Sequence, residues 1–311
     1  MADPVLATAM ALDAAFGWPG WLYRRVGHPV GGFARIISAG AEMLNRPQYS
    51  VWQRRLGGIA TMLAVIATAV GVAWAAQAIV WQTLGENGWP VIALLAFPAI
   101  AQRSLIDHVR AVSRALAAGD LPAAQQAVAM IVGRDTAALD EAGVARAAIE
   151  SLAESFCDGI IAPVFWFAML GLPGIWMFKA INTADSMIGH IEEPWRDFGW
   201  AAARIDDVAN FVPARLAAIL ICLAGLGGWR IMWCDHARHA SPNAGWPEAA
   251  MAGALGVRLA GPISYDGVGH EKPFIGSGGE ATPGDLRRAI RIVSLAWVIT
   301  LIIAGAFAWL A

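Results

Sequence analysis

Acidic side chains recur at helical spacing in the segment AAIESLAESFCDG, residues 147–159. Glu150 and Glu154 are one turn apart, and Asp158 follows one further turn on. At about 3.6 residues per turn, these side chains share a helix face about 80° wide. Like charges on one face repel each other, so the pattern indicates a bound cation: Mg²⁺, an ammonium group or arginine. The alternative is a solvated helix face. An apolar segment begins at Ile160, where solvation is poorer, which counts against that alternative.

A second polar stretch, INTADSMIGHIEEPWRDFGWAAARIDD, spans residues 181–207 between two strongly apolar segments. Asp206 and Asp207 are neighbours in it, and Mg²⁺ commonly takes one or two carboxylates together with substrate phosphates. Cationic side chains can bind phosphate, arginine with bidentate geometry. Those near the pair are Lys179, Arg196 and Arg204. The small polar side chains at the start of the stretch are Asn182, Thr183, Asp185 and Ser186. The stretch is therefore a candidate site for a metal ion and a phosphate-bearing ligand.

A structural interpretation of the same stretch is also open. Arg204 and Asp207 have the spacing of a helical salt bridge, and Trp195 and Trp200 are typical of the aromatic belt at a membrane surface. Ionisable residues close to bilayer depth are nevertheless functional candidates by default. Residue types alone do not decide between the two.

A third segment, SPNAGWPEAAMAGALGVRLAGPISYDG, covers residues 241–267. Asn243 and Glu248 are its candidate ligand contacts, and Pro247 suits the start of a helix. Many alanines and glycines favour close helix packing as in membrane bundles. A tightly packed, capped helix is therefore the alternative to a binding site.

The histidines and the remaining lysine give weaker signals. His236 and His239 form a His-x-x-His pair near the end of an apolar segment, which we interpret as polar decoration at a membrane surface and not as a metal site. His28 precedes the turn-forming Pro29, and is either a ligand contact or a helix-entry residue. Lys272 is a further candidate cation.

The composition defines the class of protein in which these side chains must act. The chain has 311 residues, of which 58% are hydrophobic and 15% charged, and its mean hydropathy is +0.53. Soluble domains are about half apolar and about a quarter charged. The sequence therefore predicts an integral membrane protein. A net charge of −2 gives no reason to expect a nucleic-acid partner. Three cysteines without a repeated spacing predict no disulfide framework.

Apolar segments predict the helices of a polytopic, all-α membrane bundle. About 20 apolar residues cross a bilayer, and the candidate segments are 57–81, 89–105, 160–178, 211–233 and 292–311, with 5–18 as a short further one. Pro163 and the Gly-Leu-Pro-Gly sequence at 171–174 predict a broken or re-entrant helix, which is tolerated where backbone is buried in protein. We expect one domain over 1–311, with a helical, soluble-facing insertion at about 106–159 and polar motif loops at about 179–210 and 234–291.

Charge distribution predicts the orientation in the membrane. Residues 23–55 carry several arginines, whereas the turn at 85–88 has Glu86 and no basic residue. Cytoplasmic loops are enriched in basic residues, so we expect a multi-pass protein of the cell (inner) membrane with 23–55, 106–159 and 179–210 on the cytoplasmic side. The candidate site residues would then face the cytoplasm.

Long motifs in a fixed order resemble one known family. They are HPVGGFARII, IESLAESFCDGIIAPVFW, KAINTADSMIGH, RDFGWAAARIDDVANFVPARL, SPNAGWPEAAMAGALGVRLAGP and TPGDLRRAI. Together they cover nearly the whole chain and are similar to the adenosylcobinamide-phosphate synthases, the CobD/CbiB membrane proteins of cobalamin biosynthesis. The sequence departs from the family pattern at Ser155 (Asn expected), His190 and Trp195 (Tyr), Pro194 (a basic residue) and Ile263 (Asn). These departures lie beside the charged positions and concern substrate detail more than reaction type.

The resemblance implies an ATP-dependent ligase that forms a carbon–nitrogen bond. It would join adenosylcobyric acid to 1-amino-2-propanol, the (R) isomer, or to its O-phosphate, giving adenosylcobinamide or its phosphate. ATP and Mg²⁺ are the implied cofactors, and the corrinoid, the amine, the lipid bilayer and other cobalamin-biosynthesis enzymes are the implied partners. An acyl phosphate needs cations at its phosphate, and the attacking amine needs a base.

The motif residues supply these groups, although they do not fix which acid has which role. The predicted catalytic residues are Glu150, Glu154, Asp158, Asp185 and Lys179. The predicted substrate-binding residues are His28, Asn182, Thr183, Ser186, Arg196, Arg204, Asn243, Glu248 and Lys272. The predicted metal ligands are Asp206 and Asp207. A transporter or a scaffold for corrinoid intermediates is the alternative function, because broken helices and buried charge are also transporter features.

Overall fold

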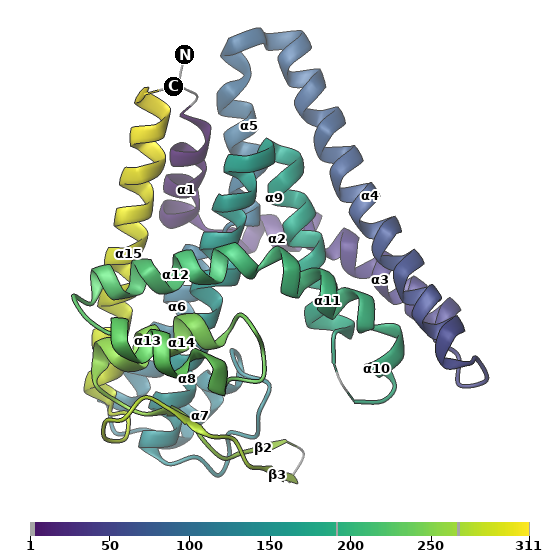
Figure 1. The fold of residues 1–311 in the computed structure, drawn as a ribbon. Coiled ribbons are helices and arrows are strands. Elements are labelled where there is room, and N and C mark those ends of the chain that lie inside the picture. The colour runs from purple at the N-terminus through teal and green to yellow at the C-terminus, as the bar shows by residue number, and fades with distance from the viewer. Residues whose placement is uncertain (1–3, 191, 266–267, 311) are drawn as a thin grey trace. The chain divides into compact units, whose positions relative to one another are not determined.

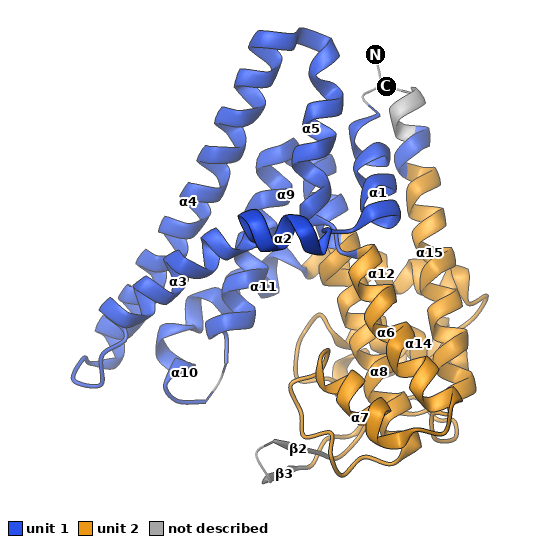
Figure 2. Ribbon diagram, turned by 180° about the vertical axis from the view of Figure 1, so that it is seen from behind, with its two compact units in different colours: residues 1–101, 162–210, 304–311 blue, residues 102–161, 211–303 orange. Residues whose placement is uncertain are grey.

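The computed structural model of the chain describes residues 4–190, 192–265 and 268–310, and its elements fall into two compact units (Figures 1 and 2). Unit 1 comprises 1–101, 162–210 and 304–311, and unit 2 comprises 102–161 and 211–303. Each unit is therefore assembled from segments that are distant in sequence. The single domain over 1–311 remains a prediction.

Unit 1 is helical in its described residues. Its elements are α1 (Val5–Phe16), α2 (Gly20–Val26), α3 (Val30–Leu44), α4 (Val51–Leu84), η1 (Gly85–Gly88), α5 (Trp89–Ala96), η2 (Phe97–Ala99), α9 (Ala162–Ile188), α10 (Trp195–Phe198) and α11 (Trp200–Ala209). Most of the polar stretch predicted as a loop over 179–210 is thus helical. Alanine-rich sequence such as that of α11 favours the helix.

Unit 2 combines helices with short strands. Its elements are α6 (Gln102–Ala117), α7 (Leu121–Ala129), α8 (Glu141–Phe156), the single π-helical turn η3 (Cys157–Ile161), α12 (Phe211–Ala224), α13 (Trp229–Asp235), η4 (His236–Arg238), α14 (Gly245–Leu255), β1 (Leu259–Ala260), β2 (Ile263–Tyr265), β3 (Val268–His270), β4 (Phe274–Ile275) and most of α15 (Pro283–Leu310). The helical insertion predicted at 106–159 corresponds to α6, α7 and α8. The strands lie in the predicted polar segment 234–291, where β1 pairs with β4 and β2 with β3, both antiparallel.

The all-α membrane fold predicted from the sequence is confirmed. Among the described residues, three helical stretches are long and apolar enough to cross a bilayer, namely Val51–Ala117, Glu141–Ile188 and Pro283–Ala306. Helices α11 and α12 form a further candidate span that is bent by 49°. These helices indicate a membrane protein.

The predicted break in α9 is present at Gly171, whose φ of 65° and ψ of −149° are not helical. Pro173 follows inside the helix. The backbone N–H of Leu172 is freed by the break and donates to Gln77 Oε1 of α4 at 3.1 Å. Polar backbone at membrane depth needs such a partner, so a side chain of a neighbouring helix completes the broken one.

Two of the expected spans end earlier than predicted. The segment 89–105 gives α5 and η2, after which Ile100 is extended (ψ 148°). Pro98 lacks the N–H that a continuing helix requires. The segment 211–233 is interrupted after Ala224, where Leu226 has a φ of 51° and Gly228 a φ of 91°. Such left-handed backbone ends a helix.

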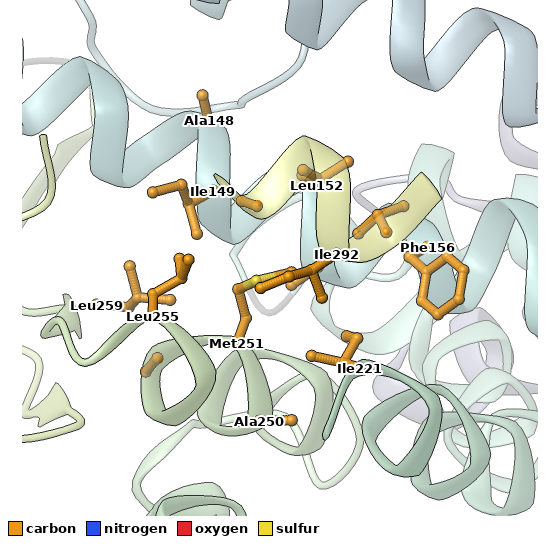
Figure 3. Packing of buried hydrophobic residues seen from close by; sticks show 14 of the residues in the cluster. Ala148, Ile149, Leu152, Phe156, Ile221, Ala250, Met251, Leu255, Leu259 and Ile292 are labelled. Atoms are coloured by element: carbon orange, nitrogen blue, oxygen red, sulfur yellow. The ribbon is translucent and has the colours of Figure 1, made fainter. Parts of the chain in front are cut away.

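Close packing fixes the polar elements within each unit. In unit 1, a Cβ on Gly58 of α4 would lie 1.8 Å from the carbonyl oxygen of Phe198 in α10, so only glycine permits this approach. In unit 2, Ile149 and Leu152 of α8 face the core beside Met251 of α14 (Figure 3). Helices α8 and α14 carry the acids of the first and third motifs, respectively, so this core positions them.

Candidate functional site

A polar cavity of about 260 Å³ lies in unit 2, and we call it the carboxylate cavity. It is lined by Ile131, Val132, Gly133, Arg134, Glu150, Ser151, Glu154, His239, Glu248, Ala260 and Lys272. These residues come from α8, α14, β1 and the loops between elements. Packing of α8 against α14 therefore gathers charged side chains that are far apart in the sequence.

Glu150 is fully engaged within this cavity. Its Oε2 forms an ion pair with Arg134, and its Oε1 accepts a hydrogen bond from the Ala260 N–H at 2.7 Å. Arg146 Nε lies 4.0 Å from the same Oε1. For Glu150, the cation that the acidic helix face predicted is thus an arginine side chain. A carboxylate held in this way is a structural and electrostatic anchor.

Glu248 is held differently, although it is only 4% exposed. Its Oε1 lies 3.6 Å from His239 Nε2, and its carboxyl group makes no hydrogen bond to any other described residue. Burial, and then the charges of Glu150 and Glu154, raise the pKa of Glu248 well above its ordinary value. Burial, and then the charge of Lys272, lower the pKa of His239. Both shifts favour the neutral forms of the pair.

The other predicted residues of unit 2 differ in their placement. Glu154 and Lys272 line the carboxylate cavity as the motif interpretation requires. Asp158 lies in η3, where the π-helical turn ends the α-helical spacing, and is not in the lining. Asn243 is also outside it, and its Oδ1 accepts a hydrogen bond from Arg215 Nη1 at 3.1 Å.

Sequence reasoning missed two titratable side chains of the lining, Arg134 and His239. Arg134 lies in the loop after α7 and carried no motif signal. His239, interpreted above as surface decoration, lines the cavity instead. Its Nδ1 accepts a hydrogen bond from the Ser241 N–H at 3.0 Å, which turns the ring inward. The position of His239 just before the motif SPNAGWPE was the available signal.

A second group of predicted residues lies in unit 1, and we call Asn182, Asp206 and Asn210 the α9–α11 cluster. Asp206 Oδ2 accepts a hydrogen bond from Asn210 Nδ2 at 3.0 Å, and Asn182 of α9 interacts with the same carboxylate. Asp206 Oδ1 is buried without a hydrogen-bond partner among the described residues. A buried, unsatisfied carboxylate oxygen fits a bound cation.

Asp207 does not share the position of Asp206. Consecutive residues of a helix point about 100° apart. Asp207 accordingly lies 3.4 Å from Arg204 on the more exposed side of α11, as the alternative salt-bridge interpretation expected. Among the described residues, no three His, Cys, Asp or Glu side chains converge on a common point. The metal site therefore remains a prediction, and the geometry favours Asp206 over the pair as its protein ligand.

The small polar side chains on α9 are partly engaged within the helix itself. Thr183 Oγ1 donates to the Lys179 carbonyl at 2.6 Å, and Ser186 Oγ donates to the Asn182 carbonyl at 2.8 Å. Asp185 lies on the same helix near its end. A hydroxyl that donates its hydrogen to the carbonyl of its own helix cannot donate it elsewhere. Thr183 and Ser186 can therefore offer a ligand only acceptor lone pairs.

His28 and Arg196 complete the predicted residues of unit 1. His28 Nδ1 accepts a hydrogen bond from the Val30 N–H at 3.3 Å, which makes it the predicted helix-entry residue. Burial, and then the charge of Lys179, lower the pKa of His28, so His28 and Lys179 are brought close. Arg196 on α10 pairs with Glu193 at 3.2 Å and is 66% exposed.

A second, apolar cavity of about 470 Å³ lies in unit 1. Its lining side chains are apolar except for Thr68. It is lined by Trp18, Leu22, Pro29, Phe33, Thr68, Ala69, Val72, Ala73, Ala76, Leu94, Leu95, Phe97, Pro98, Leu172 and Trp176.

The fold and the cavities define a helical membrane protein with an acid–base cavity in unit 2. A family model described as CobD/Cbib protein matches residues 6–293. The chain belongs to this family. The cobalamin biosynthesis protein CobD of Rhodobacter capsulatus is 50% identical over 292 residues, which cover 93% of this chain and 91% of that protein.

Further relatives carry the same name. CobD of Sinorhizobium fredii is 43% identical over 299 residues, covering 93% of this chain and 91% of its own length. CobD of Brucella suis is 44% identical over 297 residues, covering 92% and 90%. No solved structure matches. Family membership places the chain in cobalamin biosynthesis.

Proposed function

We propose that the chain is an ATP-dependent ligase that joins the free carboxylate of adenosylcobyric acid to 1-amino-2-propanol or its O-phosphate. The product would be adenosylcobinamide or adenosylcobinamide phosphate. Family membership supports the pathway. The carboxylate cavity is the observation that carries the reaction type, because it gathers acids, arginine, lysine and histidine within a strongly apolar chain.

Amide formation from a carboxylate has two chemical requirements. The carboxylate must first be activated, which in an ATP-dependent ligase gives an acyl phosphate and requires cationic side chains at the phosphates. The attacking amine must then lose a proton, which requires a base. The described side chains of this chain include candidates for both tasks.

Residues of unit 1 suit the phosphates. Lys179 and Arg204 are cations on α9 and α11, and Arg204 is 67% exposed, so that its guanidinium remains accessible. Asp206 offers a carboxylate oxygen that has no hydrogen-bond partner among the residues the structure describes. A bound Mg²⁺ at Asp206 would supply charge neutralisation at the phosphates.

Residues of unit 2 suit the acid–base step. Arg134 neutralises Glu150, and Glu154 and Glu248 add two further acids to the lining that can attract a cationic substrate. The two alternative functions make different predictions. A transporter should show no ATP hydrolysis that depends on both substrates, and a scaffold should tolerate the loss of Glu154.

The test is a reaction of the purified protein in detergent with adenosylcobyric acid, ATP and Mg²⁺, with each amine in turn, followed by mass spectrometry. We expect the corrinoid mass to rise by that of the amine less one water, with ADP formed in equal amount. Glu154→Gln should lower the rate by at least about 100-fold as loss of an acid–base group does, whereas Glu42→Gln, an exposed glutamate of α3, should not. Absence of both product and corrinoid-dependent ADP would overturn the proposal and favour transport.

A further inference from the structure

Two buried glutamates of the carboxylate cavity, Glu150 and Glu248, differ in how far their carboxyl groups are hydrogen-bonded. Glu150 accepts hydrogen bonds from Arg134 and from the Ala260 N–H, so its oxygens are engaged. The side chain of Glu248, equally buried, has His239 as its one ion-pair partner among the described residues and forms no hydrogen bond with them. A buried carboxyl group without hydrogen bonds is costly, and its position in a cavity lining points to a ligand.

The hydrogen bonds of His239 fix which of its nitrogens carries a proton. Nδ1 accepts from the Ser241 N–H, so Nδ1 has no hydrogen of its own. In a neutral imidazole the proton must then lie on Nε2. Nε2 is the atom 3.6 Å from Glu248 Oε1. The Nε2–H of His239 therefore points its proton toward Glu248. A second proton could bind only at Nδ1, and it would break the hydrogen bond from the Ser241 N–H.

The cavity is suited to a small, cationic ligand. Its volume of about 260 Å³ lies below the range of about 300–1,000 Å³ typical of pockets for drug-sized molecules. Glu154 and Glu248 can attract a positive group, and Lys272 can hold an anionic one at the other end of a zwitterion. Ile131 and Val132 add an apolar wall for a short carbon chain.

We propose that the carboxylate cavity binds the primary amine substrate as its ammonium ion, and that Glu248 takes the proton that must leave before the amine attacks. His239 is a positioning residue that orients the Glu248 carboxylate through Nε2–H. This inference rests on the proposed function and names the site of the nucleophile within it.

The proton and electron balance is complete with the substrates already named. Glu248 carboxylate removes one proton from the ammonium, and the nitrogen lone pair then forms the C–N bond at the acyl phosphate. The acyl C–O bond breaks and its electron pair leaves with phosphate, which takes the second nitrogen proton. Glu248 afterwards releases its proton to solvent. No oxidant or reductant is needed.

The surroundings of Glu248 make it a stronger base than an ordinary carboxylate. The charged groups that face it are Glu150, Glu154, Arg134 and Lys272. Burial and then the two glutamates raise the pKa of Glu248, and the arginine and lysine oppose this without cancelling it. A base whose pKa is nearer to the operating pH takes a proton from ammonium more effectively.

The decisive experiment compares two nucleophiles in the wild-type protein and in Glu248→Gln. The natural alkylamine is an ammonium ion at neutral pH, whereas hydroxylamine is largely unprotonated and needs no base. We expect Glu248→Gln to lower amide formation with the alkylamine by about 100-fold or more. Hydroxamate formation with hydroxylamine should fall by less than about threefold. Equal losses with both nucleophiles would overturn the proposal.

Further variants separate the base from a structural role. Glu248→Asp keeps a carboxylate, so it should recover part of the alkylamine reaction; if Glu248→Gln fails to fold, the same two-nucleophile comparison in Glu248→Asp decides. His239→Phe should shift the rise of the rate with pH to higher pH, because the carboxylate loses a donor that favours its charged form. An unshifted profile would remove His239 from the proposal. If wild-type protein gave neither amide nor hydroxamate, the proposed ligase function itself would fail.

Discussion

The carboxylate cavity and the α9–α11 cluster are both built from predicted site residues, yet they are assembled in opposite ways. In the cavity, contacts join separate elements, such as Glu150 of α8 with the Ala260 N–H of β1 and with Arg134 of the loop after α7. On α9 and α11, several bonds join neighbours along one helix, such as Asn210 with Asp206 and Arg204 with Asp207. The cavity depends on the tertiary fold of unit 2, whereas many bonds of the cluster would survive in isolated helices.

This difference shows that density of polar residues in a sequence is a poor guide to where a polar cavity forms. The stretch 181–207 is the more polar by inspection, but several of its side chains satisfy one another or their own backbone. The cavity takes only one or two residues from each segment. The charged residues of the cavity are harder to recognise in the sequence, and they are more completely desolvated. Substitutions there should therefore change stability more than substitutions on α11.

The largest contrast is expected between two arginines. Arg134→Met leaves the buried Glu150 without its main partner and should lower the free energy of unfolding by about 3 kcal/mol. Arg204→Met removes a pair whose arginine is 67% exposed, and should cost no more than about 0.5 kcal/mol. Thermal unfolding of both variants in the same detergent measures the difference. Equal destabilisation would mean that the cavity is no more dependent on tertiary contacts than the cluster.

The next effect separates Asp206 of the cluster from its neighbour Asp207. If Asp206 holds Mg²⁺, Asp206→Asn should slow turnover by about 100-fold, equivalent to about 2.7 kcal/mol. Asp207→Asn breaks a surface pair and should change the rate by less than about threefold. Rates are to be measured across a Mg²⁺ titration, with folding checked by gel filtration. If Asp206→Asn retained more than half of the wild-type rate throughout, the metal would have to be assigned to other acids.

Close backbone approach in unit 1 gives a stability effect of intermediate size. Gly58→Ala places a methyl group against the Phe198 carbonyl and should destabilise the protein by about 2 kcal/mol through overpacking. Gly71→Ala, in the same helix, meets no atom within 4 Å, and should stabilise by up to about 1 kcal/mol through helix propensity. Melting temperatures compare the two. Similar values would show that α10 can withdraw from α4 without cost.

The smallest effect is a change in how stability depends on pH. Because the pKa of Glu248 is raised in the folded protein, its contribution is greatest below the unfolded value of about 4.5 and is lost as pH rises towards the folded value. Glu248→Gln mimics the neutral form. The melting temperature of this variant relative to wild type should therefore increase from acidic to neutral pH. A constant difference would show that Glu248 has an ordinary pKa.

Local patterns predicted the helical class, the break near Gly171 and the shared helix face of Glu150 and Glu154, because each depends on spacing along one helix. Other features depend on which distant segments meet. Nothing in the sequence near Arg134 indicates that it pairs with Glu150, and the ring of His239 is turned by a bond to the Ser241 N–H. The early ends of α5 and α12 follow from proline and left-handed backbone, which hydropathy does not weigh.

The hydrogen bond between Gln77 and the break in α9 has a consequence for how the chain is made. Gln77 lies in α4, which the ribosome delivers to the membrane well before the segment containing Gly171. The acceptor for the Leu172 N–H is thus already inserted when the interrupted helix arrives, and Leu95, whose carbonyl accepts from Trp176 Nε1 at 3.0 Å, precedes α9 as well. Because α4 is synthesised first, the broken helix does not have to wait in lipid with backbone groups that lack hydrogen-bond partners. A circular permutation that placed α9 ahead of α4 would create such a waiting period.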